Sequence, residues 1–229
     1  MTTIASRLQA VRDRIQAAVA AAGRPPDAVR LIAVSKTFPT QAVREACQAG
    51  QRAFGENYLQ EATSKIEAVS DLPLEWHFIG PLQSNKTRPV AASFSWVHTV
   101  DRLKLAERLS AARPDELAPL QVCIQVNVSS EQSKSGCRPE EAFELANAVT
   151  RLPRLRLRGL MTIPELTSDM ELQRQRFAAL RILKEQLVSR GLELDTLSMG
   201  MSDDLESAIA EGATMVRIGR AIFGPRQPR

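Results

Sequence analysis

The sequence predicts a (β/α)8 barrel that is preceded by one additional helix. Eight short apolar runs alternate with helical patterns between residues 31 and 219, as in parallel sheets that are covered by helices. An open doubly wound sheet is the alternative, and it usually carries a Gly-rich turn after its first strand. Here that turn is Ser35-Lys-Thr-Phe-Pro39, which contains no glycine. We therefore predict a closed barrel.

The first 22 residues predict an amphipathic helix. Apolar residues recur on one of its faces at helical spacing: Ile4, Leu8, Val11, Ile15 and Val19. Gly23-Arg-Pro-Pro26 then ends the pattern. We expect one domain over residues 1–229, with the N-terminal helix at 1–22 and the barrel at 30–224.

The barrel elements follow in strict alternation. The predicted strands are 31–35, 52–55, 75–80, 95–100, 120–128, 155–162, 194–199 and 215–219. The helices between them are 40–48, 58–69, 84–92, 101–112, 139–152, 170–189 and 203–211. The helix at 170–189 places Phe177, Leu180, Leu183 and Leu187 close to one face, as a helix that packs on a sheet should.

Composition narrows the class of protein. Hydrophobic residues make up 44% of the 229 residues and aromatic residues only 4%, so aliphatic side chains must fill the core. No run approaches the roughly 18 apolar residues of a membrane span, and the N-terminus lacks a secretory pattern. We expect a cytoplasmic protein. A barrel of this size buries its own core, which favours a monomer.

Charge and cysteine content exclude several kinds of site. The net charge of +4 is spread over helices where acids and bases interleave, so we expect neither a nucleic-acid nor a membrane partner. Arg151–Arg158 alternates basic and apolar residues, which suits a strand approach with one solvated face. Cys47, Cys123 and Cys137 form no C-x-x-C pair, so neither a disulfide framework nor a metal site is indicated.

Lys36 lies where a barrel enzyme does its chemistry. It follows the first apolar run, and the loops after barrel strands form the active face. A desolvated lysine there can attack a carbonyl and form an imine, whereas a solvated one would only end the strand.

A phosphate site is predicted beside this lysine. Barrels frequently hold phosphate between the loops that follow strands seven and eight. Gly200 and Gly219 allow close backbone approach, and Ser202 and the Arg220 backbone offer hydrogen-bond donors. An imine-forming lysine near a phosphate pocket indicates either a Schiff-base aldolase or a pyridoxal 5′-phosphate (PLP) site.

Several segments resemble the PLP homeostasis proteins of the YggS/PROSC type. The resemblance rests on Trp76-His-Phe-Ile-Gly-Pro-Leu-Gln-Ser-Asn-Lys86, with Ala33–Lys36, Phe54–Tyr58, Gly159–Met161, Ser198–Asp203 and Val216–Gly224 in the same order. It implies a barrel of PLP fold type III, similar to the barrel domain of alanine racemase. It also implies PLP carried as a Schiff base on Lys36 and a role in intracellular PLP homeostasis.

The resemblance assigns roles to individual residues. Ser202, Gly219 and the Arg220 backbone would hold the phosphate, Arg217 would face the pyridine nitrogen, and Asn57 and Met201 would lie near the cofactor. His77, Met161, Ser198 and Gly200 would lie behind them. Two positions depart from the expected pattern: Pro81 replaces a His or Gly, and Arg220 replaces a Thr.

Other polar residues near strand ends have ordinary interpretations. We expect His77 and His98 to be core histidines or to lie behind the site, rather than to be catalytic. Lys86 could be a second amine that accepts PLP, but we favour an ordinary helix lysine. Asn57 could bond the ring hydroxyl of PLP, and Glu56 beside it is interpreted as solvated. Ser129–Pro139 is a polar loop that could cover the site.

The leading functional prediction is a PLP carrier that is not an enzyme. Arg217 has only donors and stays charged, so it would bond an unprotonated pyridine nitrogen, which makes the ring a weak electron sink. The alternatives are a racemase-like PLP enzyme, which we expect to need a second domain beyond Arg229, and a PLP-sensing module with a protein partner. PLP-dependent apoenzymes are the other expected partners.

Overall fold

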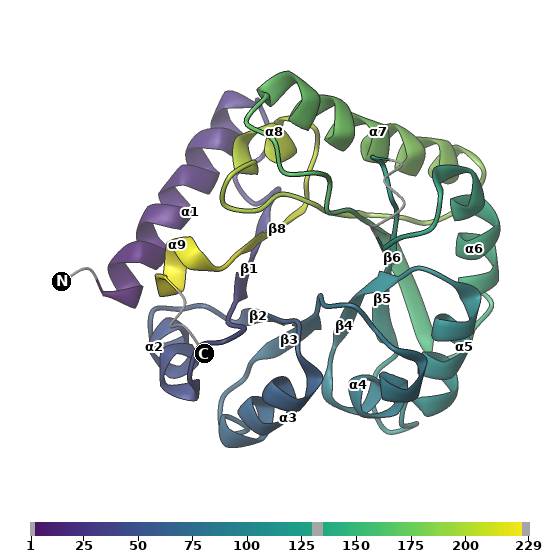
Figure 1. The fold of residues 1–229 in the computed structure, drawn as a ribbon, viewed down its shortest axis with the longest axis horizontal. Helices are drawn as coiled ribbons and strands as arrows, with labels where there is room; N and C mark the ends of the chain where they lie inside the picture. The colour runs from purple at the N-terminus through teal and green to yellow at the C-terminus, as the bar shows by residue number, and fades with distance from the viewer. Residues whose placement is uncertain (1–2, 130–134, 226–229) are drawn as a thin grey trace.

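The computed structural model describes residues 3–129 and 135–225 and contains a closed barrel of eight parallel strands (Figure 1). Neighbouring strands follow the order of the sequence, and β8 closes the barrel against β1. The strands are β1 Arg30–Val34, β2 Ala53–Glu56, β3 Glu75–Phe78, β4 Trp96–Val100, β5 Leu120–Gln125, β6 Leu155–Met161, β7 Thr196–Ser198 and β8 Met215–Ile218. The predicted barrel is confirmed.

Helices surround the barrel. They are α1 Ile4–Ala21, α2 Thr40–Gln48, α3 Leu59–Ala68, α4 Thr87–Ser93, α5 Leu103–Ala112, α6 Ala142–Val149, α7 Met170–Ser189, α8 Leu205–Ala210 and α9 Arg220–Phe223. Short 3-10 turns, η1 Ser84–Lys86 and η2 Pro139–Glu141, precede α4 and α6. No helix within the described ranges combines the length and hydropathy that crossing a bilayer requires.

Most of the predicted elements differ from the structure by one to three residues at one or both ends. The fifth strand stops at Gln125, because Val126 makes only an isolated bridge with Cys137. The helix expected at 203–211 begins at Leu205, because Asp204 before it does not have helical backbone angles, and ends at Ala210. The four-residue α9 was not predicted, since so short a helix has no periodicity to detect.

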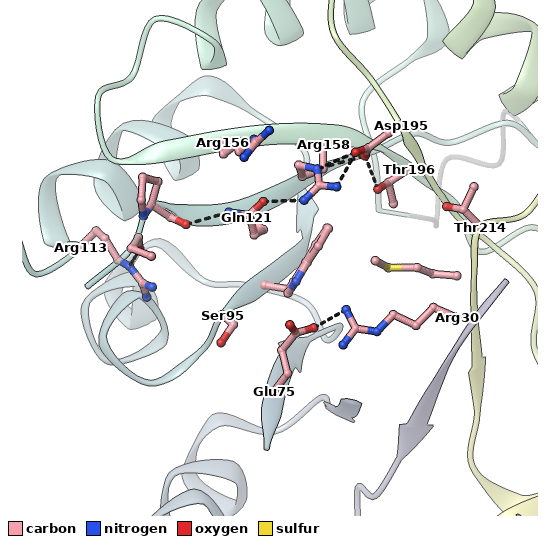
Figure 2. Close-up of a pocket in the computed structure, with 14 residues that line it drawn as sticks. Arg30, Glu75, Ser95, Arg113, Gln121, Arg156, Arg158, Asp195, Thr196 and Thr214 are labelled. Carbon is pink, nitrogen blue, oxygen red and sulfur yellow. Dashed lines mark hydrogen bonds and ion pairs between the residues drawn. The ribbon is translucent and has the colours of Figure 1, made fainter. Parts of the chain in front are cut away.

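The barrel interior is small and partly polar. Ile32, Ala53, Trp96, Cys123, Met161 and Met215 form a separate apolar cluster, distinct from the main core. Polar side chains lie on either side of this cluster along the barrel axis, and those at the amino-terminal mouth include Arg30, Glu75 and Arg158 (Figure 2).

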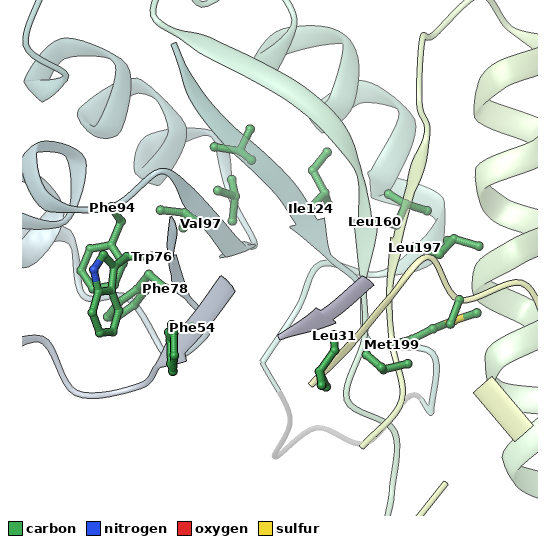
Figure 3. Close-up of a cluster of buried hydrophobic side chains, with 14 of the residues drawn as sticks. Leu31, Phe54, Trp76, Phe78, Phe94, Val97, Ile124, Leu160, Leu197 and Met199 are labelled. Carbon is green, nitrogen blue, oxygen red and sulfur yellow. The ribbon is translucent and has the colours of Figure 1, made fainter. Parts of the chain in front are cut away.

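The main core lies between the strands and the helices. Alternate strand residues point outward into it, such as Leu31 on β1, Phe54 on β2 and Val97 on β4 (Figure 3). These side chains meet the apolar faces of the helices, including Leu180 of α7. Burial of this layer supplies the main driving force for folding.

Helix α1 covers the last two βα units. It packs against α8 and α9, beside the C-terminal end of the barrel (Figure 1). Its buried residues are the five that the sequence pattern predicts. Arginine side chains extend from α1 to this region: Arg7 donates to the Ile222 carbonyl and Arg14 to the Ser202 carbonyl.

Candidate functional site

The predicted site residues converge on the carboxyl-terminal rim of the barrel. Ser202 follows β7, Gly219 follows β8, Lys36 follows β1 and Asn57 follows β2. These four strands are consecutive neighbours around the closed sheet. The rim therefore brings together residues from both ends of the sequence, with Lys36 between the loops that follow β7 and β8 on one side and Asn57 on the other.

The loop that carries Lys36 is held in an unusual conformation. Thr37 has a φ of 70°, the left-handed region that non-glycine residues seldom adopt. The Thr37 amide donates to Glu61 Oε1 at a distance of 2.5 Å. On the other side of Lys36, the Ser35 carbonyl accepts a hydrogen bond from Lys65 Nζ at 2.8 Å. Lys36 itself is half-buried. The two bonds from α3 fix the backbone on both sides of the lysine.

A buried charge cluster lies beneath this loop. Lys65 Nζ is 2.6 Å from Glu56 Oε1 and 3.0 Å from Glu61 Oε1, and the Lys65 and Glu56 side chains are only 4% and 0% exposed. The Ser35 hydroxyl donates to the same Glu56 oxygen. Burial raises the pKa of Glu56, while Lys65 opposes that shift. The interpretation of Glu56 as solvated is wrong, because α3 carries a lysine over it.

Glycines shape the loops after β7 and β8. Gly200 has a φ of 96°, and a Cβ there would lie 2.6 Å from the Ala208 side chain. A Cβ on Gly219 would lie 3.2 Å from the Val34 carbonyl, which places Gly219 against the end of β1. Glycine therefore lets the first loop pack against α8 and the second loop pack against the end of β1.

The charged residues near these loops have local partners. Asp204 Oδ1 accepts from the Met201 amide at 2.6 Å, and Asp203 lies 3.7 Å from the Arg220 guanidinium. Arg220 therefore directs its side chain to Asp203, across the gap between the two loops. Ser202 and Met201 are half-buried at the rim.

Arg217 lies inside the barrel and is 4% exposed. It donates to Ser198 Oγ at 2.8 Å and to the Thr162 carbonyl at 2.9 Å. Burial lowers its pKa to about 10, which still leaves the guanidinium charged at pH 7. Met161, at the end of β6, is fully buried in the interior cluster.

Two buried histidines extend the contacts of Arg217. His98 Nδ1 is 2.7 Å from Ser198 Oγ, and His98 Nε2 is 2.9 Å from His77 Nδ1. His77 Nε2 is in turn 2.7 Å from Glu75 Oε1. Both histidines are completely buried, and burial lowers both pKa values. The prediction of core histidines is confirmed.

A small cavity opens beside Asn57 on the same rim. It has a volume of about 260 Å³ and is lined by Asn57, Ile79, Pro81, Thr99, Gln125, Ser135 and Ile163. The Asn57 side-chain oxygen is buried and has no hydrogen-bond partner among the described residues. Gly80 approaches closely here, since a Cβ would lie 2.1 Å from the Asn57 carbonyl. Pro81, one of the two positions that depart from the expected pattern, lines this cavity.

Sequence reasoning missed the supporting polar residues. Lys65 and Glu61 were not singled out, because both lie within a helix without a recognisable motif. The available signal was the position of Lys65, a charged residue on the same buried face of the helix as Ala62. Of the loop 129–139, residues 130–134 lie outside the described residues, so its predicted role as a cover stays a prediction.

Comparison with known proteins identifies the family. The alanine racemase N-terminal domain family matches residues 6–227. A pyridoxal phosphate homeostasis protein from Pseudomonas aeruginosa is 63% identical over 99% of this chain and 97% of its own length. One from Escherichia coli is 56% identical, over 99% of this chain and 98% of its own. This chain belongs to the pyridoxal phosphate homeostasis protein family.

Solved structures agree with this family and fold. PipY of Synechococcus elongatus, determined with PLP bound, is 39% identical with a TM-score of 0.85, and the match covers 97% of this chain and all of PipY. An alanine racemase from Corynebacterium glutamicum is 16% identical, with a TM-score of 0.68, over 96% of this chain and 62% of the racemase. The racemase likeness shows a shared fold alone.

Proposed function

We propose that this chain binds PLP reversibly at the carboxyl-terminal rim, through the Lys36 amine, and buffers or delivers it in the cytoplasm as a monomer. The observation that carries the proposal is the position of Lys36 between the Gly219 loop and Asn57. The names of the Pseudomonas and Escherichia relatives and the PLP-bound structure of PipY support it.

The residues at the rim fit the parts of PLP. Ser202, Gly219 and the Arg220 backbone would hold the phosphate, because the Gly219 loop lies against the end of β1, the strand that Lys36 follows. Arg217 would face the pyridine nitrogen, and the buried Asn57 oxygen, which lacks a partner in the described chain, would accept from the ring hydroxyl. Bound PLP supplies an aldehyde that an amine can attack and a ring that withdraws electrons.

The environment of Arg217 favours a carrier over an enzyme. Its guanidinium is buried, charged and held by Ser198 and the Thr162 carbonyl, so it can only donate. A donor beside the pyridine nitrogen keeps that nitrogen unprotonated, which weakens the ring as an electron sink. Lys36 would then exchange PLP without promoting further chemistry.

A racemase-like activity is the second candidate function. It is favoured by the match to the alanine racemase N-terminal domain family over residues 6–227. A role as a PLP-sensing module with a protein partner is compatible with either. Racemisation of alanine or serine by the purified protein, above a Lys36→Ala control, would favour the racemase over the carrier.

The visible absorbance spectrum of the PLP-loaded protein tests the proposal. Wild type should show a visible absorbance band from PLP joined to an amine, and Lys36→Ala should lack it. Borohydride reduction before peptide mapping should place the added mass on the peptide that contains Lys36. We expect the modification there because Lys36 is half-buried at the proposed site, just after the end of β1.

Lys86→Ala is the matched control. Lys86 is an exposed lysine in η1, which follows β3 on the same face of the barrel, so this variant should keep both the band and the modified peptide. A wild-type protein that stays colourless with excess PLP would overturn the proposal. Equal attachment in Lys36→Ala would overturn the assignment of Lys36.

A further inference from the structure

The amino-terminal mouth of the barrel contains a second cavity, at the opposite end from Lys36. It has a volume of about 600 Å³, within the range of small-molecule sites. Its walls come from the first residues of the strands, including Arg30 of β1, Glu75 of β3, Arg156 of β6 and Thr196 of β7. Figure 2 shows these side chains around one space.

Four guanidinium groups and two carboxylates line this cavity. Glu75 lies 2.7 Å from Arg30, and Asp195 is bonded by Arg158. Each carboxylate is therefore already compensated by an arginine of the cavity wall. The other two arginines, Arg113 and Arg156, also line the cavity.

Neither Arg113 nor Arg156 has an acidic partner among residues 3–129 and 135–225. Arg113 is buried and donates only to backbone carbonyls, those of Ala91, Phe94 and Ala118. Arg156 is exposed, and none of its side-chain nitrogens makes an ion pair or hydrogen bond within the described chain. The cavity thus carries two positive charges in excess.

The remaining lining is suited to an organic phosphate. Gln121 and Thr214 add polar groups, and Trp96, Pro119 and Met215 add apolar surface. Guanidinium groups bind phosphate through charge-assisted hydrogen bonds, and a partly enclosed cavity strengthens them. The volume exceeds what a lone phosphate ion fills, which leaves room for an organic group.

We propose that the amino-terminal mouth is a binding site for a phosphomonoester of a small organic molecule, held by Arg156 and Arg113. The site is separate from the rim where PLP is proposed to bind, because its residues lie at the opposite ends of the same strands. It does not rest on the proposed function.

Calorimetric titration with phenyl phosphate tests the site. The protein is first loaded with PLP, so that the phosphate position at the rim is filled and the probe reports the mouth. Saturable binding with a Kd at or below about 1 mM is expected, and weaker binding at high salt, as for an electrostatic contact. Arg156→Gln should weaken binding about tenfold or more, since it removes a charged donor.

Arg151→Gln is the matched control for charge. Arg151 is an exposed arginine just before β6 that does not line the cavity, so this variant should bind as wild type. Arg156→Glu should abolish binding. Circular dichroism and urea midpoints confirm that the exposed positions leave folding intact. No saturable binding to wild type, or equal weakening in Arg156→Gln and Arg151→Gln, would overturn the site.

Discussion

Lys65 stabilises the Lys36 loop through a set of buried charges. It is 4% exposed and contacts Glu56, Glu61 and the Ser35 carbonyl. One oxygen of Glu56 has no partner among the described residues, so this carboxylate depends strongly on Lys65. A buried ion pair contributes little net stability over an apolar pair, but the loss of one member leaves the other charge uncompensated.

Lys65→Met should destabilise the protein by about 3–5 kcal/mol at pH 7.5, because it leaves Glu56 buried without its cation. Burial already raises the pKa of Glu56, and removal of Lys65 should raise it further. A carboxyl with a raised folded pKa contributes stability that is lost as pH rises through that pKa. The deficit should therefore shrink as pH falls.

Urea unfolding of Lys65→Met and wild type at pH 7.5 and pH 5 measures this change. Lys104→Met is the control, since Lys104 is an exposed lysine of α5, and it should unfold like wild type at both values. A deficit for Lys65→Met that is equal at the two pH values would contradict the proposed dependence on Glu56.

Helix α1 acts as a support for the proposed phosphate loop. Arg14 donates to the Ser202 carbonyl at 2.8 Å and forms a two-pronged ion pair with Glu206 of α8. On the other side of Ser202, the Met201 amide donates to the Asp204 carboxylate and closes a turn around Ser202. An element outside the barrel repeat thus fixes a loop at its rim.

Arg14→Ala should weaken PLP binding several-fold while leaving pyridoxal binding unchanged, because only PLP carries the phosphate that Ser202 is proposed to hold. The stability change should be small, about 0.5 kcal/mol, since the ion pair is largely exposed. Equilibrium titration of both ligands, followed by absorbance, measures the difference.

Arg44→Ala is the matched control for this element. Arg44 also pairs with a carboxylate through two nitrogens and donates to a backbone carbonyl, but on α2, away from Ser202. It should bind both ligands as wild type does. Equal weakening of PLP and pyridoxal in Arg14→Ala would show that α1 acts on the whole site rather than on the phosphate loop.

Elements were more predictable than contacts. The helices 40–48 and 170–189 were predicted to the residue, because their apolar periodicity and flanking turn residues are local properties. The rim residues could be placed because every strand of a parallel barrel ends on the same face. The pairing of Glu56 with Lys65 could not, since it depends on how α3 returns over β2.

The charged residues that line the amino-terminal cavity could not be predicted from the sequence, for a similar reason. The pattern Arg151–Arg158 predicted alternation, and Arg156 and Arg158 do alternate with buried leucines on β6. In a closed barrel, however, the second face of a strand points into the interior, where Arg158 meets Asp195, the residue before β7. Only closure of the barrel brings these groups together.

A hydrogen-bonded chain crosses the whole barrel interior. It runs from Arg217 through Ser198, His98 and His77 to Glu75 at the amino-terminal mouth. Arg217 only donates and the Glu75 carboxylate only accepts, so the chain has one direction when both histidines are neutral. Ser198 then donates to His98 Nδ1, and each histidine donates from Nε2 toward Glu75.

Acid should break this chain and destabilise the whole molecule. Unfolded histidine has a pKa of about 6.5, and burial lowers the pKa of both His77 and His98 in the fold. The unfolded state therefore binds more protons, and stability is lost as pH falls below about 6.5. Glu75 opposes the shift for His77, whereas Arg217 and Arg30 add to it for His98.

Urea unfolding of wild type should show a loss of about 1–2 kcal/mol between pH 7 and pH 5 that is smaller in His98→Gln, where only His77 of the two histidines still titrates. Glutamine keeps a donor and an acceptor at this position but does not titrate, so the variant should be less stable at pH 7 and flatter with pH. The raised pKa of Glu56 works in the opposite direction in both proteins and cancels in their difference. If both proteins lose stability equally between pH 7 and pH 5, protonation of His98 is not what makes the barrel sensitive to acid.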